Sequence, residues 1–303
     1  MTSKPAYQEL LASGHFPERI KRARDHLSPC TVCPECCRVD RTDGEVGHCG
    51  IGEAAWVSSY GPHLGEEAPL RGWRGSGTIF FSGCNLSCQY CQNASISQRK
   101  SGQEMDARQL ADVMLHLQRR GCHNINLVSP SHVIPQILAA VYLAAGEGLS
   151  IPLVYNTGGY DSMALLKLLS GVIDIYMPDM KYSQDEVGRK YSRVRHYPTV
   201  NQRAVKEMHR QVGDLAINQE GIAERGLLVR HLVLPHDLAG STKVLRFVAE
   251  EISRDTYVNI MDQYRPSYQA CDDPQLGRRV TREEFRRVRE LANKLGLKRG
   301  DRH

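Results

Sequence analysis

From residue 77 onward, short apolar runs alternate with stretches in which apolar residues recur every three or four positions. The short runs predict strands, and they lie at residues 77–83, 124–129, 151–157, 173–179, 227–234 and 257–263. The stretches between them predict helices; in residues 106–122, for example, Leu110, Met114 and Leu117 fall on one helix face. Six strand-helix units predict a parallel sheet covered by helices, because each crossover must return the chain to the same edge. We therefore expect an α/β fold, a partial (β/α)6 barrel over residues 77–303.

Helix starts also carry capping signals in this sequence. Asp106 and Asp161 can each cap a helix, and two pairs have the spacing of a capping box. These pairs are Ser183 with Glu186 and Thr281 with Glu284. The second pair would begin a final helix over residues 281–297.

Polar side chains recur at the carboxyl ends of all six predicted strands, which is where the active site of such a barrel gathers. After the first strand comes a cysteine loop, and the later ends carry Ser129–His132, Asn156–Gly159, Met177–Lys181, Pro235–Asp237 and Asp262–Arg265. Within the fifth strand, Arg230 and His231 are neighbours, so their side chains point to opposite faces. At most one of these two residues can face the barrel interior.

The loop after the first strand carries Cys84, Cys88 and Cys91. Three closely spaced thiolates can hold three irons of an iron-sulfur cube, and they leave the fourth iron free to bind a substrate or cofactor. A partial zinc site and buried structural thiols are the alternatives. A closed zinc site, however, requires four ligands, and this loop offers three.

A second group of cysteines lies ahead of the barrel and has the paired spacing of a closed tetrahedral metal site. The group comprises Cys30, Cys33, Cys37 and Cys49. We expect structural zinc there, with an auxiliary iron-sulfur cluster as the alternative, because cysteine spacing does not separate these metals. Cys36 and His48 are substitute ligands. So few apolar residues surround these cysteines that the module would need a metal to fold.

Composition narrows the class of protein. The 303 residues are 41% hydrophobic and 24% charged with a net charge of +5, as in a soluble globular protein without a nucleic-acid-binding module. The first residues lack the apolar core of a signal peptide, and no apolar run is long enough to span a membrane. We expect a cytoplasmic protein, with an N-terminal extension over 1–76 that contains the cysteine module at 30–50 and a glycine-rich connection at 51–76.

The cysteine loop, with Tyr90 just before its last cysteine, resembles the C-x3-C-x-aromatic-C signature of the radical S-adenosylmethionine (radical SAM) superfamily. The resemblance implies a TIM-like partial barrel in which Cys84, Cys88 and Cys91 hold a 4Fe-4S cluster and SAM chelates the open iron. It further implies that an electron passes into SAM and yields a 5'-deoxyadenosyl radical, which abstracts hydrogen from the substrate. A reducing partner such as flavodoxin or ferredoxin is then expected.

Nearly the whole chain resembles glycyl-radical-enzyme activating proteins, and most closely the uncharacterised homologues of pyruvate formate-lyase activating enzyme. The similar stretches are the N-terminal cysteine module, Gly75–Cys84, Asn124–His132, Arg230–Pro235 and Asn259–Pro266. This resemblance implies a protein substrate, either a glycyl radical enzyme or another polypeptide. A radical SAM enzyme acting on a small metabolite or peptide is the alternative. A non-catalytic zinc-binding interaction protein is the alternative from another class.

The same resemblance assigns residues to SAM. It places Tyr90 near the adenine, and it places Lys181 and Arg230 near the charges of SAM or substrate. The full set of residues expected at the cofactor is Tyr90, Ser129, Ser131, Asn156, Thr157, Met177, Asp179, Lys181, Arg230 and Gln263. Of these, Asn156, Thr157, Met177 and Asp179 would surround the SAM carboxylate or a cation beside it. Two departures stand out: Ser129–Ser131 replaces the usual glycine-glycine-glutamate, and Asn156 replaces a usual aspartate.

Overall fold

The computed structural model describes residues 4–300, and a nine-stranded sheet forms its centre. The strands are β1 Ala55–His63, β2 Ser76–Phe81, β3 Gln103–Met105, β4 Ile125–Val128, β5 Leu153–Thr157, β6 Ile175–Pro178, β7 Ala216–Ile217, β8 Ala223–Leu232 and β9 Tyr257–Met261. They run in the order β3-β1-β2-β4-β5-β6-β8, and both β7 and β9 pair with β8. Strands β2, β4, β5, β6, β8 and β9 are parallel, which confirms the six predicted strands and the α/β fold.

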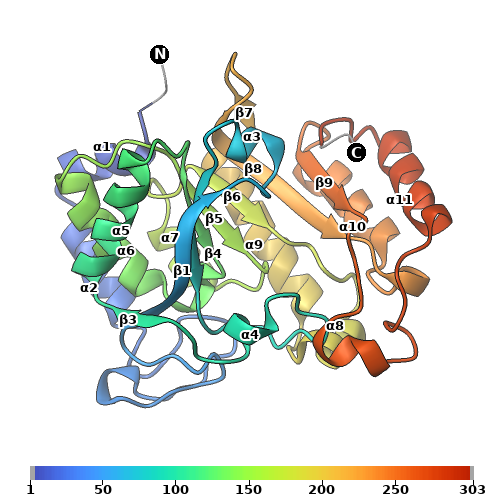
Figure 1. Cartoon of the computed structure of the whole chain (residues 1–303), viewed down its shortest axis with the longest axis horizontal. Helices are drawn as coiled ribbons and strands as arrows, with labels where there is room; N and C mark the ends of the chain where they lie inside the picture. Colours follow the sequence, from blue (N-terminus) through green and yellow to red (C-terminus); the bar gives the residue numbers. More distant parts are fainter. Residues whose placement is uncertain (1–3, 301–303) are drawn as a thin grey trace.

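Helices cover the outside of this sheet (Figure 1). They are α1 Ala6–Ala12, α2 Phe16–Arg24, α3 Ala68–Arg71, α4 Ala94–Ser97, α5 Ala107–Arg119, α6 Ile134–Gly146, α7 Met163–Leu168, α8 Asp185–Ser192, α9 Tyr197–Val212, α10 Ser241–Phe247 and α11 Arg282–Lys294. Short helical turns complete the list: η1 Arg41–Asp43, η2 Pro130–His132, η3 Pro235–Asp237, η4 Val248–Ile252 and η5 Tyr268–Asp272. Among residues 4–300, none of these helices has the length and apolarity needed to cross a membrane.

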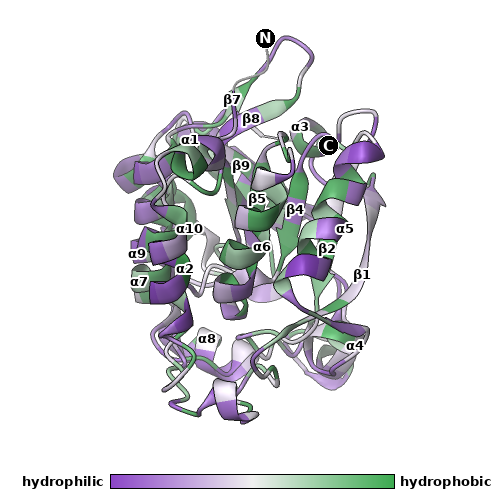
Figure 2. Cartoon of the chain, turned by 90° about the vertical axis from the view of Figure 1, so that its left-hand side faces the viewer, coloured by the Kyte–Doolittle hydropathy of each residue, from purple (hydrophilic) through white to green (hydrophobic). Residues whose placement is uncertain are grey.

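The two faces of the sheet bury different clusters of side chains. Tyr155 and Tyr176 belong to the large core between the sheet and the helices, whereas Val154 and Ile175 belong to a smaller cluster inside the barrel. This alternation arises because successive strand residues point to opposite faces. Leu70 of α3 joins the inner cluster and closes the end of the barrel where the parallel strands begin. The strands are correspondingly hydrophobic between helices whose outer surfaces are polar (Figure 2).

The stretch 51–76, predicted as a glycine-rich connection, contains strand β1, which the sequence analysis did not predict. Strand β1 runs antiparallel to β2, from Val57 opposite Phe81 to His63 opposite Ser76, and its other edge pairs with β3. The sequence does not predict this strand because it contains Gly61 and Pro62, two residue types that are rare in strands. The outer edge of β2 is therefore covered rather than exposed.

The first two helices pack into the same core as the barrel helices. Tyr7 and Phe16 are fully buried in that core, and the Tyr7 hydroxyl donates to the carbonyl of Ile151 at 2.9 Å. The N–H of Ala6 donates to Oδ1 of Asp174 at 2.8 Å. Residues 6–24 therefore attach to the barrel by ordinary packing. The division of the chain into 1–76 and 77–303 stays a prediction.

Two of the predicted helix starts are confirmed and two are wrong. Asp106 accepts from the N–H of Gln109, and Thr281 forms a capping box with Glu284. Helix α7 instead begins after Ser162, because the Asp161 carboxylate is occupied by side-chain hydroxyls within the barrel wall. Helix α8 begins after Gln184, so the Ser183 pair does not cap it. For Asp161, hydrogen bonds formed by the tertiary structure therefore outweigh the local capping signal.

Candidate active site

The cysteine loop leaves the carboxyl end of β2 and lies against the end of α8. The N–H of Ser87 donates to the carbonyl of Ser192 at 3.0 Å, and the N–H of Gln89 donates to the carbonyl of Tyr191 at 2.8 Å. Gly83 opens the loop with φ of 77°, and a Cβ there would lie 2.5 Å from the carbonyl oxygen of Cys49. Only glycine fits this position, since it needs both a positive φ and close backbone approach.

Each sulfur of the loop has a polar neighbour at hydrogen-bonding distance. The N–H of Leu86 donates to Cys84 Sγ at 3.4 Å, Ser192 Oγ lies 3.0 Å from Cys88 Sγ, and Ser97 Oγ lies 3.1 Å from Cys91 Sγ. Behind Cys88 the contacts continue, because Ser192 Oγ lies 2.7 Å from the hydroxyl of Tyr182. Hydrogen bonds to sulfur favour the thiolate, which is the form that binds metal.

Without metal these thiolates are costly to form. Burial, together with the neighbouring thiols Cys88 and Cys91, raises the pKa of Cys84 to about 12. Burial likewise raises the pKa of Cys88, although the ammonium group of Lys181 opposes that effect. A positively charged metal centre would offset both costs.

The donors fit an iron-sulfur cluster better than a single ion. Among residues 4–300, no three Cys, His, Asp or Glu side chains lie close enough together to hold one metal ion. A cube places each thiolate on its own iron, so its three ligands need not share a centre. Three thiols with polar neighbours, beside one cation, match such an anionic cluster.

A group of charged residues lies beside the cysteine loop, at the ends of β5, β6 and β8. Asp179 accepts from Arg230 Nε at 2.8 Å and from Lys181 Nζ at 2.6 Å. Arg230 Nη2 also donates to Asn156 Oδ1 at 2.8 Å. We call Asn156, Asp179, Lys181 and Arg230 the charged network. The structure thus brings together four of the residues predicted at the cofactor.

The charges of this network are fixed at neutral pH. Burial raises the pKa of Asp179, but Arg230 and Lys181 outweigh burial and hold that pKa below its usual value. Burial lowers the pKa of Lys181, yet Asp179 and then Cys88 outweigh it and raise the pKa overall. The side chains of Asp179, Lys181 and Arg230 are 15%, 16% and 19% exposed. Their charges therefore act in a partly desolvated environment.

The prediction that at most one of Arg230 and His231 faces the interior is confirmed. Arg230 points inward to the network, whereas His231 is fully buried toward the helices. His231 Nδ1 lies 2.7 Å from the carbonyl of Met180, and Nε2 lies 2.8 Å from Ser241 Oγ. Burial lowers the pKa of His231. Its role is therefore to join β8 to α10.

Other predicted cofactor residues lie in a second, separate network. Ser131 Oγ lies 2.9 Å from Thr157 Oγ1, which donates to Asp161 Oδ2 at 2.8 Å. Asn156 and Thr157 are adjacent on β5, so they face opposite sides, and Asn156 faces Arg230. Ser129 has φ of 58° and donates its N–H to the carbonyl of Asn156 at 2.9 Å. Contacts of Ser129, Ser131 and Thr157 with SAM stay predictions.

The remaining predicted residues surround the loop less closely. The hydroxyls of Tyr90 and Tyr182 are 2.6 Å apart, and Tyr90 is buried edge-on against Tyr182 and Tyr264. Met177 lies in the apolar cluster inside the barrel. Gln263 is exposed, and its carbonyl accepts from Gln92 just past the cysteine loop at 3.5 Å. Assignments of these residues to SAM also stay predictions.

Sequence reasoning missed two residues that support the loop, Ser192 and Tyr182. Ser192 comes 104 positions after Cys88 and follows no strand end, so no local signal could have pointed to it. Tyr182 directly follows the predicted strand-end stretch Met177–Lys181, so its position next to that stretch was the available signal. Glu67 is also buried under the network and accepts from Asn259 Nδ2 at 2.9 Å. Burial raises the pKa of its neighbour Glu66, while Arg230 opposes that rise.

The N-terminal cysteines lie at the same end of the barrel. Their thiols are close enough to influence one another: burial raises the pKa of Cys33, and Cys49, Cys37 and Cys30 raise it further. Of the substitute ligands, Cys36 is exposed. His48 Nε2 lies 3.0 Å from Ser87 Oγ, so its ring faces the first cysteine loop.

Comparison with known proteins decides the family. Residues 78–222 match the Radical SAM superfamily. An uncharacterised protein of Methanocaldococcus jannaschii is 32% identical over 287 residues, which cover 92% of this chain and 78% of that protein. The chain belongs to the radical SAM superfamily. The predicted superfamily is thus confirmed, and Cys84, Cys88 and Cys91 of this radical SAM protein are the residues that would hold its cluster.

Solved structures of other proteins resemble this radical SAM protein more distantly. SuiB of Streptococcus suis bound to S-adenosylmethionine has a TM-score of 0.48 and 12% identity, and covers 70% of this chain. Methylornithine synthase (PylB) has a TM-score of 0.47 and 16% identity, and covers 71% of this chain. The chain spans 44% of the SuiB chain and 60% of the PylB chain.

Proposed function

We propose that this radical SAM enzyme cleaves SAM reductively and abstracts hydrogen from a polypeptide, with a glycyl radical enzyme as the first candidate substrate. The cluster and SAM, when bound, supply a one-electron cleavage that yields a 5'-deoxyadenosyl radical. The electron would come from a flavodoxin or ferredoxin in a reducing cytoplasm. The four N-terminal cysteines hold a metal in this proposal.

The charged network carries the proposal. SAM has an amino group and a carboxylate, so it needs fixed charges of both signs beside the cluster. Asp179 offers a carboxylate, and Lys181 and Arg230 offer cations; all three are held by hydrogen bonds of 2.6 to 2.8 Å. Lys181 lies near enough to Cys88 to affect its pKa. Such preorganised charges orient a zwitterion without reorganising during the reaction.

The open sheet supports a polypeptide substrate. In the part of the chain that the structure describes, β9 pairs with β8, and β2 pairs with β4 and β1. The parallel strands therefore do not close into a full barrel, and β9 and β2 remain the two ends of the parallel series. A segment of another protein can approach the cysteine loop along such an open edge.

A small polar metabolite or peptide is the second candidate substrate. The observation that favours it is a pair of carboxylates, Glu66 and Glu67, which lie near enough to Arg230 to raise its pKa. Glu67 Oε2 is buried and has no hydrogen-bond partner among residues 4–300. These groups could bind a polar substrate inside the barrel.

The first experiment tests SAM cleavage. The protein is reconstituted anaerobically with iron and sulfide, mixed with SAM and dithionite, and assayed for 5'-deoxyadenosine. We expect formation by the wild type and by Cys36→Ser, whose thiol is exposed, and none by Cys88→Ala. A wild type with a full cluster that forms no 5'-deoxyadenosine would contradict the proposal.

The second experiment identifies the substrate class. Host-cell extract is separated into a protein fraction and a small-molecule fraction, and each is added to the same assay. We expect the protein fraction to stimulate 5'-deoxyadenosine formation, to lose this effect after protease digestion, and to show an organic radical by electron paramagnetic resonance (EPR). Stimulation by the small-molecule fraction alone would replace the polypeptide with the second candidate.

A further inference from the structure

The four N-terminal thiols Cys30, Cys33, Cys37 and Cys49 form one group, which we call the cysteine tetrad. Three of its sulfurs accept hydrogen bonds from backbone N–H groups. The donors are Glu35 to Cys33, His48 to Cys37 at 3.3 Å, and Ile51 to Cys49. Gly47 allows this approach, because a Cβ there would lie 2.7 Å from Cys37 Sγ. Several N–H groups directed at sulfurs are typical of thiolates that bind metal.

Among residues 4–300, the tetrad does not form a group of side chains that could hold a single metal ion. Four sulfurs at about 2.3 Å from one zinc would lie within roughly 4 Å of one another. No three of the Cys, His, Asp and Glu side chains in residues 4–300 converge in that way, although the tetrad thiols are near enough to affect one another's pKa. In an iron-sulfur cube each thiolate binds a different iron, so the four sulfurs need not meet at one centre.

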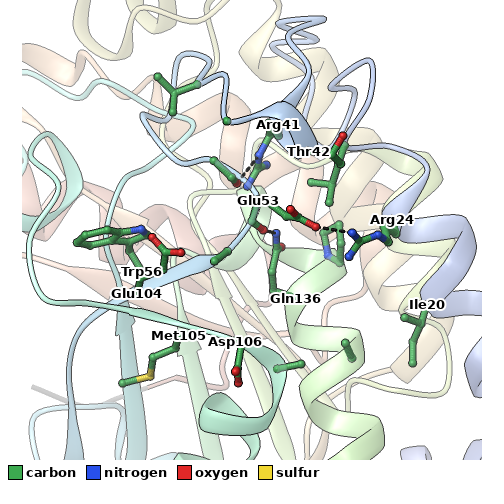
Figure 3. A pocket seen from close by; sticks show the side chains of 18 of the residues that line it. Ile20, Arg24, Arg41, Thr42, Glu53, Trp56, Glu104, Met105, Asp106 and Gln136 are labelled. Atoms are coloured by element: carbon green, nitrogen blue, oxygen red, sulfur yellow. Dashed lines mark hydrogen bonds and ion pairs between the residues drawn. The ribbon is translucent and has the colours of Figure 1, made fainter.

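A buried cation lies in the tetrad segment, between Cys37 and Cys49. Arg41 is 1% exposed, and it donates to the carbonyls of Gly52 at 2.9 Å and His132 at 2.8 Å. Its Nη2 has no hydrogen-bond partner among the described residues. Arg41 lines a cavity of about 540 Å³ (Figure 3), in which the carboxylate of Glu53 pairs with Arg24 instead.

The charge of Arg41 therefore needs another counter-ion. One acidic side chain near Arg41 is the thiol of Cys49, a member of the tetrad. Burial raises the pKa of Cys49, and the positive charge of Arg41 opposes that rise. Burying an unpaired guanidinium is costly, whereas an iron-sulfur cluster with four thiolates has a net negative charge. Arg41 is thus placed to stabilise such a cluster.

The module around the tetrad has little core of its own. Its buried apolar cluster consists of Leu27, Cys30 and Val32, with Val39 packed against them. Such a small cluster does not repay the conformational entropy of ordering residues 25–50. Metal binding would supply the missing free energy.

We propose that Cys30, Cys33, Cys37 and Cys49 bind a second 4Fe-4S cluster, with no iron left open to substrate. This cluster lies beside the first cysteine loop. Cys49 and Cys84 line one cavity of about 100 Å³, and Asn85 Nδ2 donates to the carbonyl of Tyr160 at 2.6 Å. The Tyr160 ring is in turn near Glu35 and Cys33, both of which raise its pKa after burial. The inference deepens the metal site of the proposed function and does not depend on the substrate.

The test removes the first site and counts metal at the second. The variant Cys84→Ala/Cys88→Ala/Cys91→Ala is reconstituted anaerobically, and iron, sulfide and zinc are measured. We expect about four irons per chain and a cluster EPR signal after dithionite reduction, against about eight irons in the wild type. Cys36→Ser in the triple background is the matched control and should keep the full iron content, because Cys36 lies outside the tetrad.

Three outcomes would overturn the inference. These are one zinc and no iron in the triple variant, no metal in it although it is folded by circular dichroism, or about four irons with one zinc in the wild type. The metal content of the wild type can be interpreted even if the triple variant does not fold. Because none of these readouts depends on 5'-deoxyadenosine, failure of the second cluster is distinguishable from failure of SAM cleavage.

Arg41 offers an independent readout. In the triple background, Arg41→Gln should shift the reduction potential of the remaining cluster to a more negative value, because a nearby cation stabilises the reduced form. Arg24→Gln is the control, since Arg24 pairs with Glu53 at the surface. An unchanged potential in Arg41→Gln would show that Arg41 does not face the cluster.

Discussion

The two cysteine groups of this protein lie side by side, yet they are held in different ways. The loop with Cys84, Cys88 and Cys91 is fixed by the barrel: backbone hydrogen bonds join it to α8, and a cluster of buried tyrosines surrounds it. The cysteine tetrad has only the small cluster around Leu27 and Val32. The fold positions the first site through contacts of the barrel, whereas in our proposal the second site needs its metal to fold. This is expected of a reactive centre beside a structural one.

Metal removal should separate the two regions most strongly. Treatment with a chelator, or the variant Cys33→Ala, should unfold residues 25–50 and leave the barrel folded, because the tetrad module lacks a sufficient core. Limited proteolysis followed by mass spectrometry should find new cleavage within 25–50 but none within β2, β4 or β5. Resistance of that segment to protease in the metal-free protein would show that the two regions do not differ.

Breaking the charged network should destabilise the barrel itself. Asp179→Asn removes the carboxylate that accepts hydrogen bonds from both Arg230 and Lys181, and we expect a loss of about 3 to 5 kcal/mol in the free energy of unfolding. Urea denaturation of the metal-free protein measures it. Asp185→Asn is the matched control, because its surface pair with Arg189 should contribute less than about 1 kcal/mol. Equal losses of unfolding free energy in both variants would show that the charged network stabilises the fold no more than a surface ion pair does.

The contact between the N-terminal helices and the barrel should contribute to the free energy of unfolding in a way that depends on pH and not on metal. Asp174 accepts the N–H groups of Ala6 and Leu153, and burial raises its pKa to about 6. A carboxyl whose pKa is raised on folding stabilises the folded state in its neutral form, so stability is lost as pH rises from about 4 to 6. The loss should be up to about 3 kcal/mol.

Comparison with Asp174→Asn isolates this contribution, because other carboxylates also titrate in this range. The difference in free energy of unfolding between wild type and variant should change between pH 4 and pH 6 and stay flat above pH 7. Urea denaturation at each pH measures it. A difference that does not vary with pH would mean that Asp174 keeps an ordinary pKa.

The smallest expected effect concerns the support of Cys88. Ser192→Ala removes the hydroxyl 3.0 Å from Cys88 Sγ, and we expect a more negative reduction potential and about tenfold slower SAM cleavage. Ser97→Ala removes the corresponding hydroxyl beside Cys91 and serves as the comparison. Because Ser192 is fully buried and Ser97 is not, the Ser192 variant should show the larger shift. Equal shifts would indicate that burial does not strengthen the contact.

The sequence predicted the repeating units well because their signals are local. Apolar runs marked all six parallel strands, and three closely spaced cysteines marked the first metal site. The four residues of the charged network were also predicted, since each belongs to β8 or to the end of a strand. Strand β1 was not predicted because Gly61 and Pro62 interrupt its pattern of strand-forming residues. The strand forms nevertheless because it pairs with β2.

The sequence by itself determined the superfamily, the six parallel strands and the cysteines of the first site, because short spacing and periodicity express them directly. Tertiary structure decided which neighbour of a pair faces inward, so that Arg230 joins the network and His231 does not. It also brought Ser192 to Cys88 from 104 positions further along the chain. Contacts of this kind depend on how separate elements pack, and the local sequence does not specify that packing.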